Sequence, residues 1–233
     1  MSEYIQRNLL LDSISRECGL GKWVEPVEFP IGHEIAAPGR NAGYFYFPTS
    51  GVLSTGIQLR EGTVAASLTI GNEGMVGVPV WLGVTTALES VLQQLPGQIM
   101  RIPARAFCER IVGHRRTERL VKRFIAYSLR FGSQAAACNV YHSVGQRMSR
   151  WLLDMVDRAD STRVKITQAS LAHTLGVRRQ SVTEAALYMQ QSGVIRYKRG
   201  EIRILDRQGL ETSTCECYSE MSRLYDRLVR AAL

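Results

Sequence analysis

The sequence of 233 residues predicts an α+β chain with three consecutive parts: a strand-rich front half, one long helix, and a compact unit of two short helices and a hairpin. From Trp23 to Ile102, glycine and proline recur every few residues and separate short runs such as YFYF and SVLQQL, a pattern typical of a sandwich or barrel. From Arg105 to Arg158 the chain holds no proline, and apolar residues return at helical spacing. The run from Ile166 to Leu205 predicts the third part.

This run reads as helix, glycine turn, helix and hairpin. Thr167 is suited to cap a first short helix, and Gly176 can adopt the positive φ of a tight turn. Arg199-Gly200 forms the expected turn between two short strands. The second helix has apolar residues at helical spacing: Val182, Ala185, Ala186 and Met189. The order predicts a winged helix-turn-helix, which places its second helix in the major groove of DNA.

Charge divides the chain in the same way. Residues 1–112 hold 8 Lys+Arg and 10 Asp+Glu, a balance of −2, whereas residues 113–233 hold 21 and 11, a balance of +10. A basic back half favours double-stranded DNA as its partner. We expect no membrane partner, because the chain has no apolar run near 18 residues and no signal-peptide pattern. Five irregularly spaced cysteines favour the reducing cytoplasm over a disulfide framework.

Several stretches of the chain resemble the Crp/Fnr family of bacterial transcription regulators. VGQRMSRWLLDMVDR resembles the helix before the family's linker, and ITQASLAHTLGVRRQSVTEAALYMQQSGVIRYKRGEIRILD resembles its helix-turn-helix and wing. FPIGHEI and YFYFPTSGVLS resemble the first strands of its cyclic-nucleotide-binding-like β-roll, a jelly-roll. The resemblance implies a homodimer that binds a near-palindromic promoter site and contacts RNA polymerase. The implied domains are an effector roll with a short N-terminal helix (1–112), a dimerisation helix (113–140) and a winged helix-turn-helix domain (141–233).

The second helix of the winged unit begins RRQSVTE, and family members read bases from these positions. Arginine can donate to guanine, glutamine can pair with adenine and glutamate can accept from cytosine. The predicted base readers are Arg179, Gln180, Thr183 and Glu184. The predicted contacts to the DNA backbone are Thr167, Gln168, Arg178, Ser181, Lys198 and Arg199. Glu184 has an alternative role, which is an intrahelical pair with Arg178 or Arg179.

A heptad-like seam is predicted along the long helix, with steps of three and four residues. Its members are Val121, Phe124, Ser128, Phe131, Ala135 and Cys138. We interpret the seam as the contact between two copies of the chain. The alternative is an ordinary amphipathic helix packed on its own domain.

The roll is predicted to sense an effector other than a cyclic nucleotide bound in the usual way. Cyclic-nucleotide-binding members hold the phosphate with an Arg-Ser pair, which here falls near Ala87-Leu88, and no lysine or arginine occurs between Arg60 and Arg101. A buried phosphate without a cation is costly, so we expect no high-affinity cAMP or cGMP binding of that kind. An apolar effector pocket is predicted at Gly74, Met75, Val76, Gly77 and Trp81. The alternative is that these residues are simply core.

No metal, cofactor or enzymatic activity is predicted. Cys215 and Cys217 form a C-x-C pair, but the sequence shows no two further ligands beside them, and Cys18 alone cannot hold an iron–sulfur cluster. Nucleophile-elbow and phosphate-loop motifs are absent from the sequence. Two alternatives stay open: an effector-independent regulator of the same family, and a ligand-binding or enzymatic roll with a nonspecific nucleic-acid-binding tail.

Overall fold

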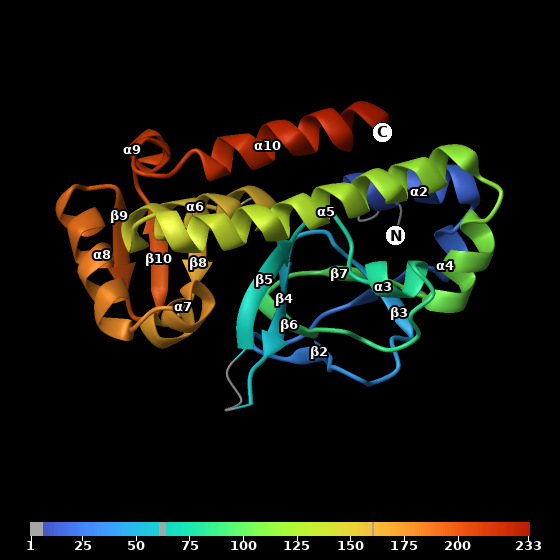
Figure 1. The fold of residues 1–233 in the computed structure, drawn as a ribbon, viewed down its shortest axis with the longest axis horizontal. Coiled ribbons are helices and arrows are strands. Elements are labelled where there is room, and N and C mark those ends of the chain that lie inside the picture. Colours follow the sequence, from blue (N-terminus) through green and yellow to red (C-terminus); the bar gives the residue numbers. More distant parts are fainter. Residues whose placement is uncertain (1–6, 61–63, 160) are drawn as a thin grey trace.

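The computed structural model describes residues 7–60, 64–159 and 161–233. It has the predicted order of a strand-rich front part, a long helix and a helix-turn-helix unit (Figure 1). The N-terminal helix α2 spans Leu9–Cys18, and the first six residues of the chain lie outside the described ranges. Asn8 caps α2 by accepting from the Leu11 amide at 2.9 Å, and Gly19 ends it with φ 62°.

Two antiparallel sheets form the roll, in the strand orders β2-β6-β4-β5 and β1-β7-β3. Buried apolar side chains of both sheets, such as Leu53, Val91 and Ile99, form one core. Phe45 belongs to a second core that the roll shares with the helices, where it stacks on Phe107 with ring centroids 3.9 Å apart. The strands alternate buried and less buried positions because neighbouring side chains of a strand point to opposite faces. The strands of the roll are β1 (Glu25–Val27), β2 (Glu34–Ala36), β3 (Tyr44–Pro48), β4 (Val52–Gln58), β5 (Val64–Ile70), β6 (Ser90–Leu95) and β7 (Ile99–Pro103). Its short helices are η1 (Gly21–Trp23), α3 (Val78–Trp81) and α4 (Ala104–Ile111).

The long helix α5 spans Arg115–Tyr141, close to the predicted 113–140, and runs along the roll. The predicted dimer seam is wrong on four of its six members. Val121, Phe124 and Phe131 are buried in the core that α5 shares with the roll, and Cys138 is buried in a separate cysteine cluster. The sequence showed an apolar stripe but not its partner, and the stripe covers the chain's own roll.

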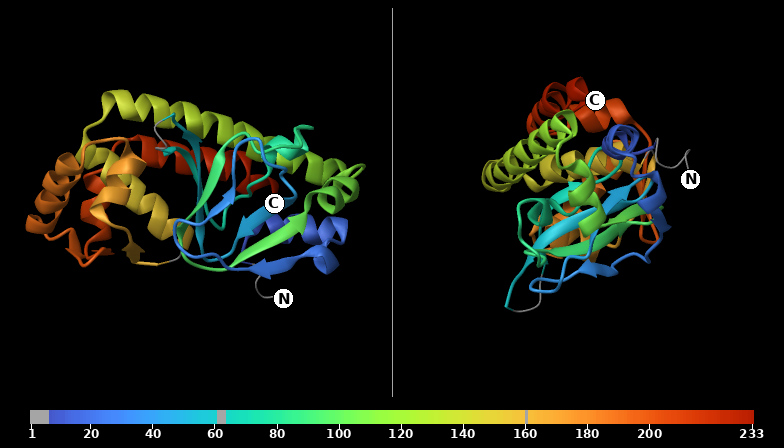
Figure 2. Two further views of the ribbon diagram at one scale, coloured as in Figure 1. Left: turned by 90° about the horizontal axis from the view of Figure 1, so that it is seen from below. Right: turned by 90° about the vertical axis from the view of Figure 1, so that its right-hand side faces the viewer.

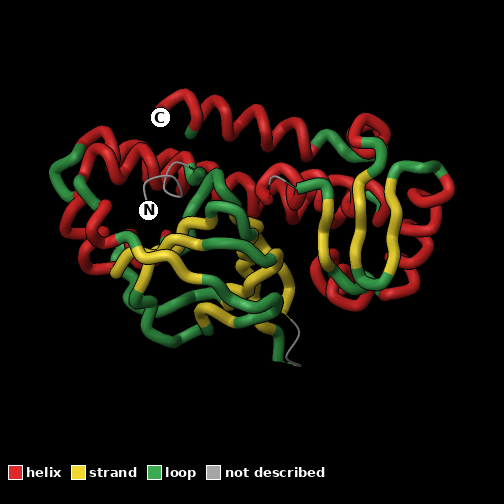
Figure 3. Tube along the Cα trace, turned by 180° about the vertical axis from the view of Figure 1, so that it is seen from behind, coloured by secondary structure: helices red, strands yellow, loops and turns green. Residues whose placement is uncertain are grey.

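The winged helix-turn-helix unit has its own core. The helix α6 (Val144–Ala159) packs against α7 (Gln168–Leu175) and α8 (Arg179–Gln191) through side chains such as Leu152 and Met189. A small sheet in the order β8-β10-β9 completes the unit and is seen from behind in Figure 3. Its strands are β8 (Arg163–Lys165), β9 (Ile195–Lys198) and β10 (Glu201–Ile204).

The C-terminal segment departs from the predicted domain boundaries. The sequence places residues 141–233 in one domain, but α10 (Cys217–Leu228) packs back along α5 after the short helix α9 (Arg207–Thr212). Met221, Tyr225 and Val229 are part of the core of the roll and α5. The final turn η2 spans Arg230–Ala232. Figure 2 shows α10 and α5 side by side from two further directions. Burial of the apolar side of α10 accounts for this return.

A buried charge network joins the helix-turn-helix unit to the roll. Arg158 of α6 donates to the Glu73 carboxylate at 2.6 Å and to the Thr69 hydroxyl at 2.8 Å, and it pairs with Asp154 at 3.3 Å. Burial lowers the pKa of Arg158, but the charges of Glu73 and Asp154 outweigh this and raise it. Tyr225 of α10 donates to the Glu73 carbonyl at 2.8 Å. The arginine therefore stays charged and joins α6 to the roll, while Glu73 also joins the roll to α10 through Tyr225.

Arg158→Ala should lower the free energy of unfolding by about 3–5 kcal/mol, because it leaves the Glu73 carboxylate in the interior without its cation. Urea titration followed by circular dichroism measures this loss. Arg223→Ala is the matched control, since that guanidinium pairs with Glu220 on the exposed side of α10 and should cost less than about 1 kcal/mol. Equal losses in the two variants would contradict the role given to Arg158.

Candidate nucleic-acid interface and cavity

One side of α8 is anchored and the other is exposed. Val182, Ala186 and Met189 are buried in the core of the unit, which fixes the rotation of the helix about its axis. The four predicted base readers all lie on the opposite, exposed side: Arg179, Gln180, Thr183 and Glu184. The Thr183 hydroxyl donates to Gln168 of α7 at 3.2 Å, so that the two helices are joined at this face. The structure thus brings the predicted readers together on one accessible surface.

The partner of Glu184 is a glutamine. Gln180 donates from Nε2 to the Glu184 carboxylate at 3.0 Å, one helical turn away. Within the described residues, no ion pair joins Glu184 with Arg178 or Arg179, so the predicted alternative pairing is not found. An amide and a carboxylate therefore stand side by side, next to the exposed guanidinium of Arg179. Such a surface can donate to guanine and can bind adenine or cytosine edges.

The predicted backbone contacts come from two neighbouring places. Thr167 caps α7 by accepting from the Ser170 amide at 3.1 Å, and Gly176 ends α7 with φ 62°, as predicted. The wing turn lies beside this cap, because the Ile166 amide donates to the Gly200 carbonyl at 2.8 Å. Lys198 and Arg199 at the turn are exposed. Among the remaining predicted contacts, Arg178 is exposed at the start of α8, whereas Ser181 and Gln168 are half-buried.

Two exposed residues of α8 were missed by the sequence analysis. Leu187 is 52% exposed and Tyr188 is 70% exposed, and both continue the face of Thr183 and Glu184 by one turn. Their spacing of three and four residues was visible in the sequence, but large apolar side chains on a helix are expected to be buried. Here they extend the accessible surface toward the end of the helix.

A cavity of about 470 Å³ lies between the roll and α5. Of the five residues predicted to form an effector pocket, Met75, Val76 and Gly77 line this cavity. The prediction was wrong for Gly74, whose missing side chain leaves room for the Phe124 ring, and for Trp81, which packs edge-on against Phe107. Both residues pack in the core beside the cavity and do not line its wall.

The wall of the cavity is mainly apolar. No lysine or arginine of the described residues lines it, and Ala87, Leu88 and Glu89 stand where the family's phosphate-binding pair is expected. The Ser67 hydroxyl donates to Glu89 at 3.2 Å and lies 2.7 Å from the Thr55 hydroxyl. A carboxylate at this place repels a phosphate, which agrees with the absence of a cyclic-nucleotide cassette from the sequence.

The structure also brings together four side chains that the sequence analysis did not connect. Cys138 and His142, from the end of α5, lie with Cys215 and Cys217, and their possible ligand atoms are all within 4.8 Å of one another. The prediction that the C-x-C pair has no further ligands beside it is therefore wrong. The two pairs are separated by about a third of the chain, so no local spacing rule could detect them.

Comparisons with known proteins agree with this architecture. Residues 146–213 match the Crp-like helix-turn-helix domain. The fold is similar to that of FixK2 from Bradyrhizobium japonicum, with TM-score 0.67 and 15% identity over 82% of this chain and 98% of that one. It is also similar to TTHB099, a transcriptional regulator of the CRP family from Thermus thermophilus, with TM-score 0.65 and 18% identity over 80% and 95% of the two chains. The c-di-GMP responsive regulator CLP from Xanthomonas campestris gives TM-score 0.64 and 15% identity over 83% and 99%. No curated protein sequence matches the chain.

The fold and the helix-turn-helix domain define the class, which is a DNA-binding transcription regulator. Within that class, the chain carries the Crp-like domain and has the fold of the Crp/Fnr regulators, which confirms the resemblance seen in the sequence. None of the described helices combines the length and the apolar character needed to cross a membrane.

Arg199→Asn should raise the free energy of unfolding by roughly 1 kcal/mol, because Arg199 adopts a left-handed φ of 50° that asparagine tolerates better. Thermal or urea unfolding of the variant measures the gain. Gly200→Ala, at φ 76° in the same turn, is the opposite control and should destabilise the protein. A loss of stability in Arg199→Asn would show that the arginine side chain stabilises the wing through contacts of its own.

Proposed function

We propose that this protein is a homodimeric, sequence-specific transcription regulator that binds a near-palindromic promoter site through α8 and responds to an apolar effector in the roll. The observation that carries the proposal is the exposed face of α8, where Arg179, Gln180, Thr183 and Glu184 project from a helix anchored on its other side. RNA polymerase is the proposed protein partner, and the cytoplasm is the proposed location. No enzymatic step is proposed for the roll.

The α8 face supports specific rather than general DNA binding. A surface that binds any sequence needs only cations, whereas Gln180 and Glu184 add an amide and a carboxylate to it. A carboxylate is repelled by the DNA phosphates. It contributes favourably to binding where it accepts a hydrogen bond from the amino group of cytosine. We infer that these residues face base edges, while Lys198, Arg199 and Arg178 neutralise phosphates. Binding should therefore weaken with rising salt concentration.

The exposed side of α5 supports a dimer. Four of the six members of the predicted seam are buried, but a second heptad-like stripe faces solvent. It passes through Lys122, Ala126, Leu129, Ser133, Ala136 and Val140. Leu129 is 71% exposed and Val140 is 74% exposed, so the stripe presents large apolar side chains to solvent along one line of the helix. Pairing two copies along this stripe would cover them and would allow the two α8 helices to reach sites one helical turn of DNA apart, about 34 Å.

The cavity supports an apolar effector that acts through the dimer. Ile125, Leu129 and Ser133 of α5 line the cavity, and two of these three also belong to the exposed stripe. A bound effector would therefore contact the face of α5 that meets the partner chain. Its binding would shift the populations of two dimer arrangements. An effector-independent regulator of the same fold is the second candidate, which the apolar wall also permits if the cavity stays empty in the cell.

Arg179→Ala should lose about 1–3 kcal/mol of binding free energy on a selected operator and little on random DNA, because it removes a base contact. Lys198→Ala should weaken binding to both DNAs alike, because it removes a phosphate contact. The operator is first found by selecting genomic fragments bound by the purified protein, and the affinities are then measured by fluorescence anisotropy at fixed salt. An operator-to-random affinity ratio near one for the wild type would instead favour a nonspecific nucleic-acid-binding tail.

Leu129→Glu should convert the dimer into monomers, because it places a charge in the middle of the proposed stripe. Sedimentation velocity at several protein concentrations measures the assembly state. Val112→Glu is the matched control, since Val112 is 69% exposed at the end of α4, away from the stripe, and should leave the dimer intact. A Leu129→Glu protein that stays folded and dimeric would place the subunit contact on another surface.

A further inference from the structure

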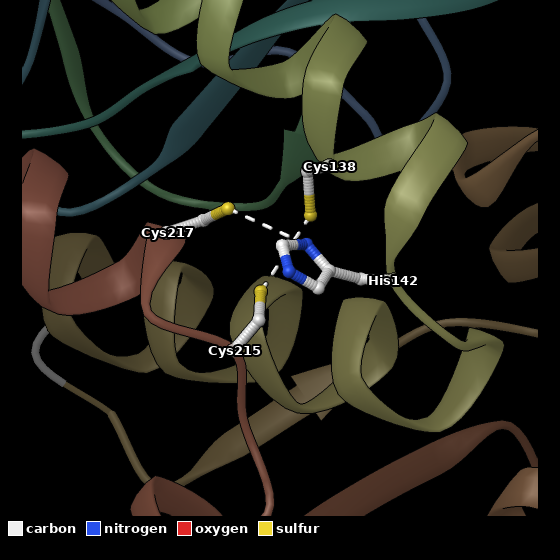
Figure 4. Close-up of side chains that lie close together, drawn as sticks. All are labelled: Cys138, His142, Cys215 and Cys217. Atoms are coloured by element: carbon white, nitrogen blue, oxygen red, sulfur yellow. Dashed lines mark hydrogen bonds between the residues drawn. The ribbon is translucent and has the colours of Figure 1, made fainter.

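Three cysteines and one histidine meet at the junction of α5, α6 and α10. Figure 4 shows Cys138, His142, Cys215 and Cys217 pointing toward one another, and we refer to them as the Cys3His cluster. Sγ of Cys138 lies 3.6 Å from Sγ of Cys215, and Sγ of Cys217 lies 3.5 Å from Nδ1 of His142. The three thiols are buried, and they form a small core of their own, separate from the apolar cores on either side.

We propose that the Cys3His cluster binds one Zn²⁺ ion with tetrahedral geometry. Three cysteines and one histidine are an established ligand set for structural zinc. At a Zn–S distance of about 2.3 Å, the sulfur atoms at two corners of a tetrahedron are about 3.8 Å apart. The 3.6 Å between Cys138 and Cys215 is close to this value, so that one ion can be bound with small movements of the side chains.

The neighbours of the cluster match what a zinc ligand set requires. Nε2 of His142 lies 3.2 Å from the Glu216 carboxylate, while Nδ1 faces Cys217. A carboxylate at Nε2 holds the proton there and leaves the lone pair of Nδ1 free for the metal. Gln134 donates from Nε2 to Sγ of Cys217 at 3.0 Å, which favours the thiolate form of that cysteine.

Charge balance also favours a bound cation. Three thiolates in a buried site would repel one another, and Zn²⁺ reduces their total charge to −1. Two positive side chains remain nearby to offset the remainder, because Arg147 and Arg150 of α6 both interact electrostatically with Cys138.

Two other uses of these cysteines, an iron–sulfur cluster and a disulfide, fit the site less well than a single zinc ion. In an iron–sulfur cluster the cysteine sulfurs bind different iron atoms, so they lie farther apart than the ligands of a single ion. The four ligand atoms here are within 4.8 Å of one another, which leaves too little room for such a cluster. A disulfide between Cys138 and Cys215 would use two thiols but would give Gln134, Glu216 and His142 no common role. Both remain distinguishable outcomes of the test below.

The site would connect segments that are far apart in the sequence. Cys138 and His142 belong to the end of α5, where the chain turns into α6, and Cys215 and Cys217 belong to the connection from α9 to α10. A bound ion would hold the start of α10 against the end of α5 and would fix the direction in which α6 leaves. Zinc binding should therefore stabilise the folded chain by an amount that depends on free metal concentration.

The test is to purify the full chain under reducing conditions and to measure bound metal by mass spectrometry, with Co²⁺ as a spectroscopic substitute. We expect one Zn²⁺ per chain, and visible absorption bands of tetrahedral, thiolate-bound Co²⁺. Cys217→Ser should abolish both, whereas Cys108→Ser should keep both, since Cys108 lies on α4 outside the cluster. Gln134→Ala retains all four ligands and should bind zinc about 10- to 100-fold more weakly.

Several outcomes would overturn the proposal. One is a wild-type protein with all cysteines reduced by thiol titration that takes up neither Zn²⁺ nor Co²⁺ with these bands. Others are a Cys138–Cys215 disulfide in protein kept under reducing conditions, the visible absorption of an iron–sulfur cluster, or an equal loss of zinc in Cys108→Ser and Cys217→Ser. The wild-type Co²⁺ spectrum and Gln134→Ala keep the test decisive if Cys217→Ser does not fold.

Discussion

The buried guanidinium of Arg158 is the interaction on which the arrangement of the two halves depends. It meets Glu73 and Thr69 of the roll and Asp154 of its own helix, and its aliphatic part fills the space left by the missing side chain of Gly71. A charge buried in this way is tolerated only when its partners are in place. The roll and the helix-turn-helix unit are therefore fixed relative to each other by electrostatics as well as by apolar packing.

Three parts of the surface of α5 make three different kinds of contact. Its inner side, with Phe124 and Phe131, closes the core of the roll, and Leu129 is shared between the cavity wall and the exposed stripe. Its last turn supplies Cys138, and His142 follows directly after the helix. Because a helix is stiff, a change at the cavity, the stripe or the cysteines would move α5 as one body. The start of α6, which follows α5 in the chain, would move with it. We propose that the position of α8 is sensitive to all three.

Local rules explain why the helix-turn-helix unit was predictable in detail. Thr167 caps α7, Gly176 has the positive φ of a turn, and Arg199-Gly200 turns the wing, all through interactions within a few residues. The exposed face of α8, with the residues predicted to read bases, follows from the burial of Val182 and Met189 at helical spacing. The apolar lining at Met75 and Gly77 followed from the lack of cations in the segment.

The sequence by itself determined the order of elements, the exposed face of α8 and the lack of lysine and arginine between Arg60 and Arg101, because these depend on neighbours in the chain and on composition. Tertiary structure alone decided which stripe of α5 is covered, since Val121 and Phe124 do not reveal whether their partner is the roll or a second subunit. It also decided the return of α10 onto α5 and the meeting of Cys138 with Cys215. Contacts between residues so distant in the chain arise from the packing of whole elements, and no periodicity within either segment encodes them.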